Sequence, residues 1–186
     1  ETGQIFWIFH LFSNFFNKNS TLIDCTFDEK EDLESSILRI QKEAEIAARK
    51  GIIHLILSDK NMSDTRLAIP MLICVGSINS HLIKQKLRGY TSINVQTGEA
   101  LDTHSFATLL GAGATTVNPY LALDSIYQRF EKKLFGKFDY EECVVRYIKS
   151  INSGLLKIMS KMGISVLSSY RGGCNFETVG LSRTIV

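Results

Sequence analysis

Residues 139–172 constrain the fold of this chain most, because they predict a long amphipathic helix that runs into a strand with almost no loop. Asp139 and Glu142 have the spacing of a capping box at the helix start. Gly163 is placed to end the helix, and the apolar run 164–167 after it predicts a short buried strand. In between, apolar residues recur at steps of four and three, which places them on one helical face: Val144, Ile148, Ile151, Leu155, Ile158 and Met162.

Short apolar segments alternate with helical patterns along the rest of the chain. Strands are predicted at residues 21–25, 52–57, 91–95 and 115–117, and helices at residues 29–50, 70–88, 102–110 and 119–134. This alternation predicts an α/β fold whose β-α units form a parallel sheet with right-handed crossovers. Both an open doubly wound sheet and a rudimentary, incomplete TIM-like barrel fit the pattern. Gly154 lies in the middle of the long helix at a cost of about 1 kcal/mol relative to Ala, which indicates a close neighbour or a bend.

The composition is that of an ordinary globular domain and argues against a nucleic-acid partner. The chain has 186 residues, 45% of them hydrophobic and 22% charged, which is enough to build a core. Its net charge is only +2, and the lysines and arginines are spread along the sequence without forming a basic patch. We expect one main domain, residues 21–186, after a separate apolar segment, residues 1–20.

Residues 5–16 are apolar and aromatic, but a helix of twelve residues cannot span a bilayer. No basic region or small-residue cleavage site accompanies them, so neither a membrane anchor nor a secretory signal is expected. The segment is expected either to pack on the core as an opening strand or helix, or to be exposed and favour association. Four widely spaced cysteines predict buried thiols in a reducing, cytoplasmic compartment and no metal or iron–sulfur site: Cys25, Cys74, Cys143 and Cys174.

The candidate ligand or interdomain contacts are polar residues that follow the predicted strands. In parallel α/β sheets, ligands meet the carboxyl ends of the strands. This sequence places Ser58, Asp59, Glu99, Asn118 and Arg171 at those ends.

Lys157 and Lys161 lie one turn apart near the end of the long helix, where cations suit the helix dipole. They are expected either to be solvated or to share an anion site with Arg171. Gly111 and Gly113 begin a dinucleotide-like motif, but it follows a helix and precedes a strand, which is the wrong order for a phosphate loop. No nucleophile–base or metal-ligand arrangement is evident, so no catalytic, cofactor-binding or metal residue is assigned.

Seven segments carry a more specific signal: residues 22–27, Ile56-Leu-Ser-Asp59, Ala68-Ile-Pro-Met-Leu-Ile-Cys-Val-Gly76, Thr97-Gly-Glu-Ala100, Leu109-Leu-Gly-Ala-Gly-Ala114, Val117-Asn-Pro-Tyr-Leu-Ala122 and residues 147–172. Together and in this order, they resemble the central domain of the large subunit of glutamate synthase, of the ferredoxin- or NADPH-dependent type. The resemblance covers about residues 20–186, and residues 1–20 are not matched.

The resemblance implies a division of labour. In that family, an amidotransferase domain hydrolyses glutamine with an N-terminal cysteine, and a flavin-binding barrel reduces the 2-iminoglutarate formed from 2-oxoglutarate and ammonia. The central domain links the two, helps to wall the ammonia path, and resembles a rudimentary flavin barrel without holding flavin. The full-length enzyme uses FMN and an iron–sulfur cluster, whereas no cofactor is expected in this chain.

The chain also departs from the family pattern. It begins at Glu1 without the nucleophilic cysteine, and it ends at Val186 before a flavin barrel or cluster cysteines. Gly173-Cys-Asn-Phe-Glu177 stands where the family usually has Ala-Gln-Ile-Phe-Glu, and His81 alone remains of a histidine cluster. These differences suggest relaxed interdomain contacts. They leave open whether the chain is an intact gene product, a split subunit or a degraded remnant.

Two functions follow from this reading. The first is a noncatalytic scaffold domain of glutamate synthase, acting in glutamate biosynthesis and nitrogen metabolism, with other domains or subunits, or a second copy, as partners. The second is a stand-alone small-molecule or anion-binding α/β protein that uses the strand carboxyl ends. A concave pocket with convergent polar groups would favour the second function.

Overall fold

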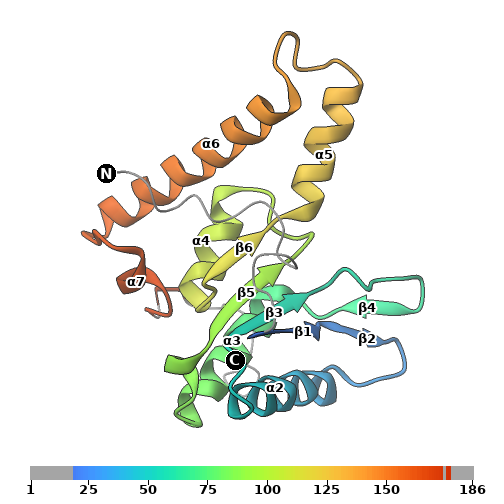
Figure 1. Cartoon of the computed structure of the whole chain (residues 1–186), viewed down its shortest axis with the longest axis vertical. Coiled ribbons are helices and arrows are strands. Elements are labelled where there is room, and N and C mark those ends of the chain that lie inside the picture. Colours follow the sequence, from blue (N-terminus) through green and yellow to red (C-terminus); the bar gives the residue numbers. More distant parts are fainter. Residues whose placement is uncertain (1–18, 174, 177–186) are drawn as a thin grey trace.

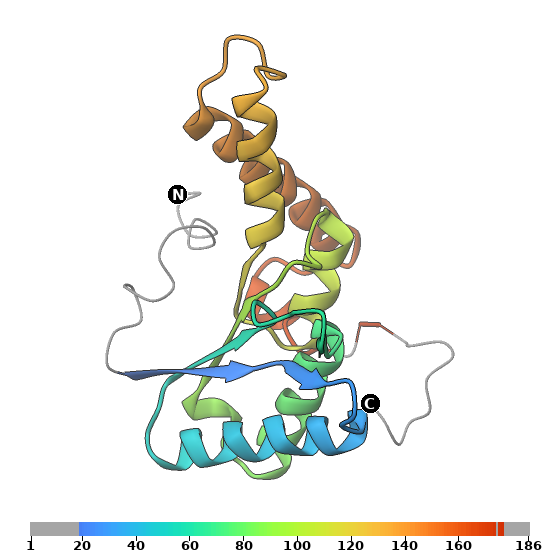
Figure 2. The ribbon, with the colours of Figure 1, turned by 90° about the vertical axis from the view of Figure 1, so that its right-hand side faces the viewer.

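The computed structural model describes residues 19–173 and 175–176 and has an α/β fold built on a four-stranded parallel sheet (Figures 1 and 2). Its strands are β1 (Ser20–Asp24), β3 (His54–Ser58), β5 (Ser92–Gln96) and β6 (Thr116–Asn118). The helices that connect them are α2 (Leu33–Arg49), α3 (Met71–Lys84) and α4 (Thr103–Ala112), and they pack against one another in the same order. The predicted α/β class and the parallel sheet are confirmed.

The strand order decides between the two architectures that fit the sequence. A doubly wound sheet reverses its strand order and carries helices on both faces. Here the order is β1-β3-β5-β6, so each strand lies beside the next one in the chain and runs parallel to it. Right-handed crossovers between such neighbours bring every connecting helix to the same face. The sheet is therefore part of an incomplete barrel, with α2, α3 and α4 on its outside.

The two faces of the sheet differ in chemistry. The face under the helices is apolar and buried, and it carries Ile23, Leu55, Leu57, Ile93, Val95 and Val117. The opposite face carries polar pairs between neighbouring strands. His54 Nδ1 lies 2.8 Å from Ser92 Oγ, and the Thr116 hydroxyl donates to Asn94 Oδ1 at 2.9 Å. This polar face is the one that a closed barrel would turn inward.

Three helices begin at acidic residues whose side chains accept a backbone N–H. Asp32 accepts from Ser35 at 3.3 Å, and Asp102 accepts from the third residue after it at 2.9 Å. Asp139 accepts from Glu142 at 2.7 Å, as the capping-box spacing predicts. The Asp32 cap explains why α2 begins at Leu33, a few residues after the predicted start at residue 29.

Two short strands and a 3-10 turn lie in segments for which the sequence pattern indicated only loops or helix ends. β2 (Thr26–Asp28) pairs antiparallel with β4 (Arg66–Ala68), and η2 (Arg88–Tyr90) precedes β5. The β2–β4 pair is held by Arg66, which donates to Thr26 Oγ1 at 3.0 Å and to Asp24 Oδ2 at 3.2 Å. Three-residue strands of mixed polarity have too little alternation to be detected by periodicity.

The predicted fifth strand at residues 164–167 is wrong. Gly163 ends α6 (Tyr140–Lys161) with a left-handed φ of 70°, as expected, but a turn and the short helix α7 (Leu167–Tyr170) follow it. Tyr170 is buried, and its hydroxyl donates to the Ala107 carbonyl at 3.1 Å, so this segment packs on α4 and does not join the sheet. A run of four apolar residues fits a buried helical turn as well as a strand, because periodicity cannot separate the two at that length.

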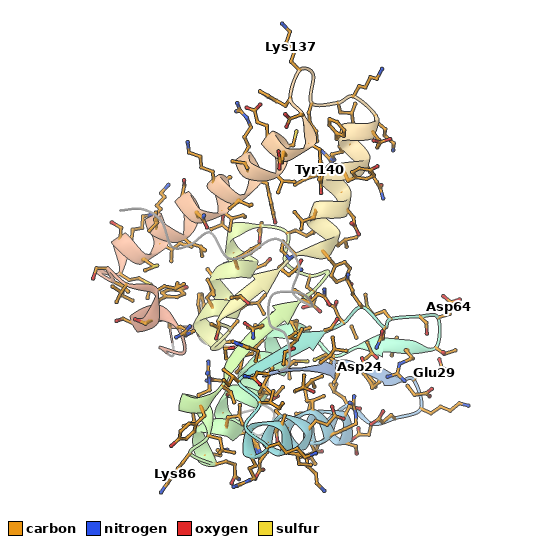
Figure 3. The ribbon with its side chains drawn as sticks, in the orientation of Figure 1. Asp24, Glu29, Asp64, Lys86, Lys137 and Tyr140 are labelled. Carbon is orange, nitrogen blue, oxygen red and sulfur yellow. The ribbon has the colours of Figure 1, made fainter. Side chains whose placement is uncertain are left out.

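A two-helix arm, residues 120–148, projects from the sheet (Figures 1 and 2). It consists of α5 (Tyr120–Glu131), the first half of α6 and the loop between them, and Lys137 lies at its outer end (Figure 3). The rings of Tyr127 and Tyr140 join the two helices edge to face at 5.5 Å. The second half of α6 leaves the arm and packs on α4, where it contributes Ile151, Leu155 and Met159 to the core.

Candidate functional site

Four of the predicted site residues follow neighbouring strands at the carboxyl end of the sheet: Ser58, Asp59, Glu99 and Asn118. Ser58 and Asn118 are the last residues of β3 and β6, and Asp59 and Glu99 lie in the loops after β3 and β5. Ser58 and Asp59 are buried, Asn118 is half-buried and Glu99 is partly exposed. The sequence therefore placed these four residues at the correct edge of the sheet.

The Asp59 carboxylate fixes the loop that follows β5. Its Oδ2 accepts the Thr97 hydroxyl at 2.6 Å and the Gly98 N–H at 3.0 Å, and the ring of Tyr120 at the start of α5 lies against Gly98. Asp59 is only 1% exposed, so these protein donors replace the water that a buried carboxylate would otherwise lack. One side chain thus joins the end of β3 to the β5–α4 loop.

Tyr120 is a member of this cluster that the sequence reasoning missed. Burial, followed by the proximity of the Asp59 carboxylate, raises the pKa of Tyr120 to about 12. Lys60 Nζ lies 5.0 Å from the centroid of the Tyr120 ring. Gly98 lies against the same ring, since a Cβ added to it would come 3.1 Å from the Tyr120 hydroxyl. Their position in the sequence could have indicated them, because Lys60 and Tyr120 lie two residues after the ends of β3 and β6.

Glu99 caps α3 from a distant loop. Its Oε2 accepts the N–H of Met71 at 3.0 Å, the first residue of that helix. Pro70 precedes the helix and has no side chain that could cap it, so Glu99 supplies the missing acceptor. Burial raises the pKa of the Glu99 carboxyl, and the negative charge of Asp59 adds to this effect.

The two neutral residues of the cluster differ in their contacts. The Ser58 hydroxyl donates to Gln96 Oε1 at 3.0 Å and accepts the Lys60 N–H at 3.3 Å. Asn118 Oδ1 is buried and meets no donor from the described residues. At the carboxyl end of the sheet, the oxygens of Ser58, Asp59 and Glu99 are thus engaged by protein donors, whereas Asn118 Oδ1 is not.

The structure does not bring Arg171 to this cluster, because the strand that it was expected to follow does not form. Arg171 lies close enough to Arg88 that its charge, after burial, lowers the pKa of the Arg88 guanidinium. Arg88 precedes β5 and donates to the Gly113 carbonyl, just before β6, at 2.9 Å. The two arginines are therefore at the amino end of the sheet. Lys157 and Lys161 are exposed on α6, and an anion site that they share with Arg171 stays a prediction.

The described residues contain no group of three His, Cys, Asp or Glu side chains that could hold a metal ion. Cys25, Cys74 and Cys143 are buried free thiols, as predicted, whereas Cys174 lies outside the described residues. Among the helices that the structure describes, none is long and apolar enough to cross a membrane. Residues 1–18, for which alternative placements were expected, also lie outside the described part of the chain.

A family model described as the glutamate synthase central domain matches residues 4–182. The chain belongs to this family. The glutamate synthase [NADPH] large chain of Azospirillum brasilense is 49% identical over 181 residues, which are 96% of this chain and 12% of that protein. The corresponding chain of Bacillus subtilis is 45% identical over 90% of this chain and 11% of its own length. The ferredoxin-dependent glutamate synthase of Spinacia oleracea is 44% identical over 83% of this chain and 10% of its length.

This member of the glutamate synthase central domain family thus spans about 12% of the length of such relatives. Among solved structures, a flavocytochrome b2 variant with sulfite bound superposes with a TM-score of 0.55 at 17% identity, over 78% of this chain and 36% of that one. The DHODH of Eimeria tenella in complex with ferulenol gives a TM-score of 0.53 at 15% identity, over 84% of this chain and 38% of that one. Both are TIM-barrel-like flavoenzymes, and at this identity the likeness concerns the fold alone, which agrees with an incomplete barrel.

Proposed function

We propose that this chain is the central, scaffolding domain of a glutamate synthase, the enzyme that makes glutamate from glutamine and 2-oxoglutarate, and that it has no reaction centre of its own. The observation that carries the proposal is the engagement of the two carboxylates at the sheet end. Asp59 holds the β5–α4 loop, and Glu99 caps α3. In a TIM-like enzyme, this edge is where reactive side chains face the substrate.

The proposed partners are the other domains or subunits of glutamate synthase, with self-association as the alternative. The arm offers them an exposed surface of mixed apolar and charged character. Leu134 and Phe138 are 66% and 40% exposed in its outer loop. The arm carries equal numbers of basic and acidic side chains: Arg129, Lys132, Lys133, Lys137 and Arg146, and Asp124, Glu131, Asp139, Glu141 and Glu142. We propose no nucleic-acid or membrane partner and a cytoplasmic location, although the plant relatives are named as chloroplastic proteins.

FMN and an iron–sulfur cluster, which the resemblance implies for the full-length enzyme, are proposed to lie outside this chain. The described residues do not fit either group well. An iron–sulfur cluster needs several cysteines close together, and no such group is present among the described residues. A flavin phosphate would meet the carboxylates of Asp59 and Glu99 at the sheet end, where TIM-like barrels usually supply backbone N–H groups. The same acidic, engaged edge gives no support to the alternative of a stand-alone anion-binding protein.

A flavin titration tests the cofactor part of the proposal. FMN is titrated into the purified chain while flavin fluorescence is followed, and glutamine hydrolysis and glutamate formation are assayed on the same sample. We expect no saturable quenching and no turnover. Stoichiometric quenching at micromolar protein, or turnover of glutamine or 2-oxoglutarate by the chain alone, would contradict the scaffold role.

A domain exchange tests the scaffold part. Residues 4–182 replace the matching segment of the Azospirillum brasilense large chain, to which they are 49% identical. We expect the chimera to retain glutamate synthase activity. The same chimera with Asp59→Asn is expected to lose activity together with thermal stability. A chimera that folds, binds its cofactors and still lacks activity would count against the proposal.

A further inference from the structure

Two arginines from segments far apart in the sequence lie close together at the amino end of the sheet. Arg88 precedes β5, and Arg171 follows α7. The Asn79 side chain links them, because its Oδ1 accepts from Arg88 Nε at 2.7 Å and its Nδ2 lies 3.9 Å from the place of a Cβ on Gly172, the residue after Arg171. Burial, and then the charge of Arg171, lower the pKa of the Arg88 guanidinium. The fold thus brings together two positive charges that repel each other.

The Arg88 guanidinium is held in place but not neutralised. Besides the Nε bond to Asn79, its Nη1 donates to the Thr91 carbonyl at 2.6 Å and its Nη2 donates to the Gly113 carbonyl at 2.9 Å. All three acceptors are neutral. A guanidinium has five N–H groups, so each terminal nitrogen keeps one N–H for a further acceptor. Among the residues that the structure describes, no carboxylate lies within ion-pair distance of Arg88 or Arg171.

The surroundings of the two arginines provide a further donor and open space. Thr91 is only 7% exposed, and its hydroxyl oxygen is buried without a hydrogen-bond partner among the described residues. No atom lies within 4 Å of a Cβ built on Gly89, the residue after Arg88. The two residues after Arg171 are exposed glycines, which carry no side chain that could cover the guanidinium. The backbone therefore leaves room for a small ligand beside both arginines.

We propose that Arg88 and Arg171 bind a phosphate group at the amino end of the sheet. Guanidinium groups suit phosphate because two of their N–H groups can pair with two of its oxygens at once. A dianion balances both positive charges and replaces their repulsion by attraction, which a neutral ligand cannot do. Thr91, already bonded to Arg88 through its carbonyl, offers an unused hydroxyl as a further donor. Arg88 thus takes the role that the sequence suggested for Lys157 and Lys161, and the inference does not depend on the proposed function.

Thermal unfolding of the full chain in the presence of inorganic phosphate tests the proposal. Ionic strength is held constant with sodium chloride, so that general screening does not change between samples. We expect the melting temperature of the wild type to rise saturably, by about 5–10 °C at a hundred-fold excess of phosphate over its Kd. Acetate, which has a single negative charge, should give a smaller shift at the same concentration. Glycerol 3-phosphate is titrated in parallel: tighter binding than that of inorganic phosphate would identify a phosphorylated small molecule as the ligand, and weaker binding would identify free phosphate.

Arg171→Gln is the main variant, because no described residue accepts a hydrogen bond from the Arg171 side chain that the fold would lose. It should abolish the saturable rise, and without phosphate it should melt at or above the wild type, since the repulsion is relieved. Thr91→Val should weaken phosphate binding by about five-fold. Lys157→Gln combined with Lys161→Gln removes two exposed charges of α6 and is the control that should keep the wild-type rise.

Three results would overturn the proposal. The first is an equal, saturable rise in the wild type and Arg171→Gln. The second is a rise that disappears in the lysine double variant, because the phosphate would then bind on α6. The third is an equal shift with acetate and phosphate, because a dianion would then have no advantage at this site.

Discussion

The Thr103 side chain lies directly over the Cα of Gly154, where α6 crosses the start of α4. A Cβ added to Gly154 would come 2.5 Å from Thr103 Cγ2 and 2.6 Å from its hydroxyl oxygen. Of the two explanations that the sequence allowed for a glycine in mid-helix, the close neighbour is therefore correct. Gly154 permits α6 to approach the body of the domain and then continue into the arm.

Gly154→Ala is expected to destabilise the fold, although alanine is the better helix former. The gain of about 1 kcal/mol in helix propensity is smaller than the overpacking cost of about 1–3 kcal/mol at a tight helix crossing. Chemical denaturation measures the free energy of unfolding, with Ser153→Ala as the exposed control on the same helix. Replacing Thr103 by Ala in the Gly154→Ala background should restore part of the loss. A variant more stable than the wild type would show that the crossing is loose.

Asp59→Asn is expected to lower the free energy of unfolding by about 2–3 kcal/mol. The amide oxygen can take the place of Oδ2 and accept from both Thr97 and Gly98, but its NH₂ group then lies 3.3 Å from the Gly98 N–H in place of Oδ1, and the negative charge that strengthens both bonds is lost. Urea denaturation of this variant is compared with Asp64→Asn, an exposed carboxylate in the loop before β4 (Figure 3). Equal stabilities of the two variants would show that the Asp59 contacts contribute little.

Met159→Asp is expected to be severely destabilising, by more than about 3 kcal/mol, because it buries an unpaired charge on the inner face of α6. Met159 is 4% exposed, whereas its neighbour Leu156 is 51% exposed on the outer face. Leu156→Asp is therefore the matched control and should melt close to the wild type. Thermal unfolding followed by circular dichroism distinguishes the two. An unchanged melting temperature for Met159→Asp would mean that this face of the helix is solvated.

The raised pKa of Glu99 predicts a pH dependence of stability. For an acid with a raised pKa, the folded state holds the proton more tightly than the unfolded state. Its contribution to stability is therefore complete at low pH and declines as the pH rises above 4.5 and through the folded pKa. The difference in unfolding free energy between the wild type and Glu99→Gln should fall as the pH rises above 4.5.

Glu29→Gln, at an exposed turn (Figure 3), should show no such trend. If the stability of the wild type relative to Glu99→Gln instead rose with pH, the charge of Glu99 at the N-terminus of α3 would outweigh its burial.

The sequence by itself determined the four parallel strands, the helices between them and the carboxylate cap at Asp139, since each depends on a local pattern of side chains. It also placed Ser58, Asp59, Glu99 and Asn118 at one edge of the sheet, because parallel strands end on the same side. The incomplete barrel could not be separated from a doubly wound sheet, because both share this local alternation. The two architectures differ in which strands lie side by side in the sheet, and this order is seen only in the tertiary structure.

The tertiary structure decided the contacts between segments that are far apart in the sequence. Residues 164–167 could have become a strand, but packing of Tyr170 on α4 made them a turn into a short helix. Arg171 consequently lies at the amino end of the sheet beside Arg88, away from Asp59. The Asp59 carboxylate, directly after β3, binds Thr97 and Gly98 in the loop after β5. Periodicity describes which face of an element is apolar, but the partner of that face depends on the three-dimensional packing of the whole chain.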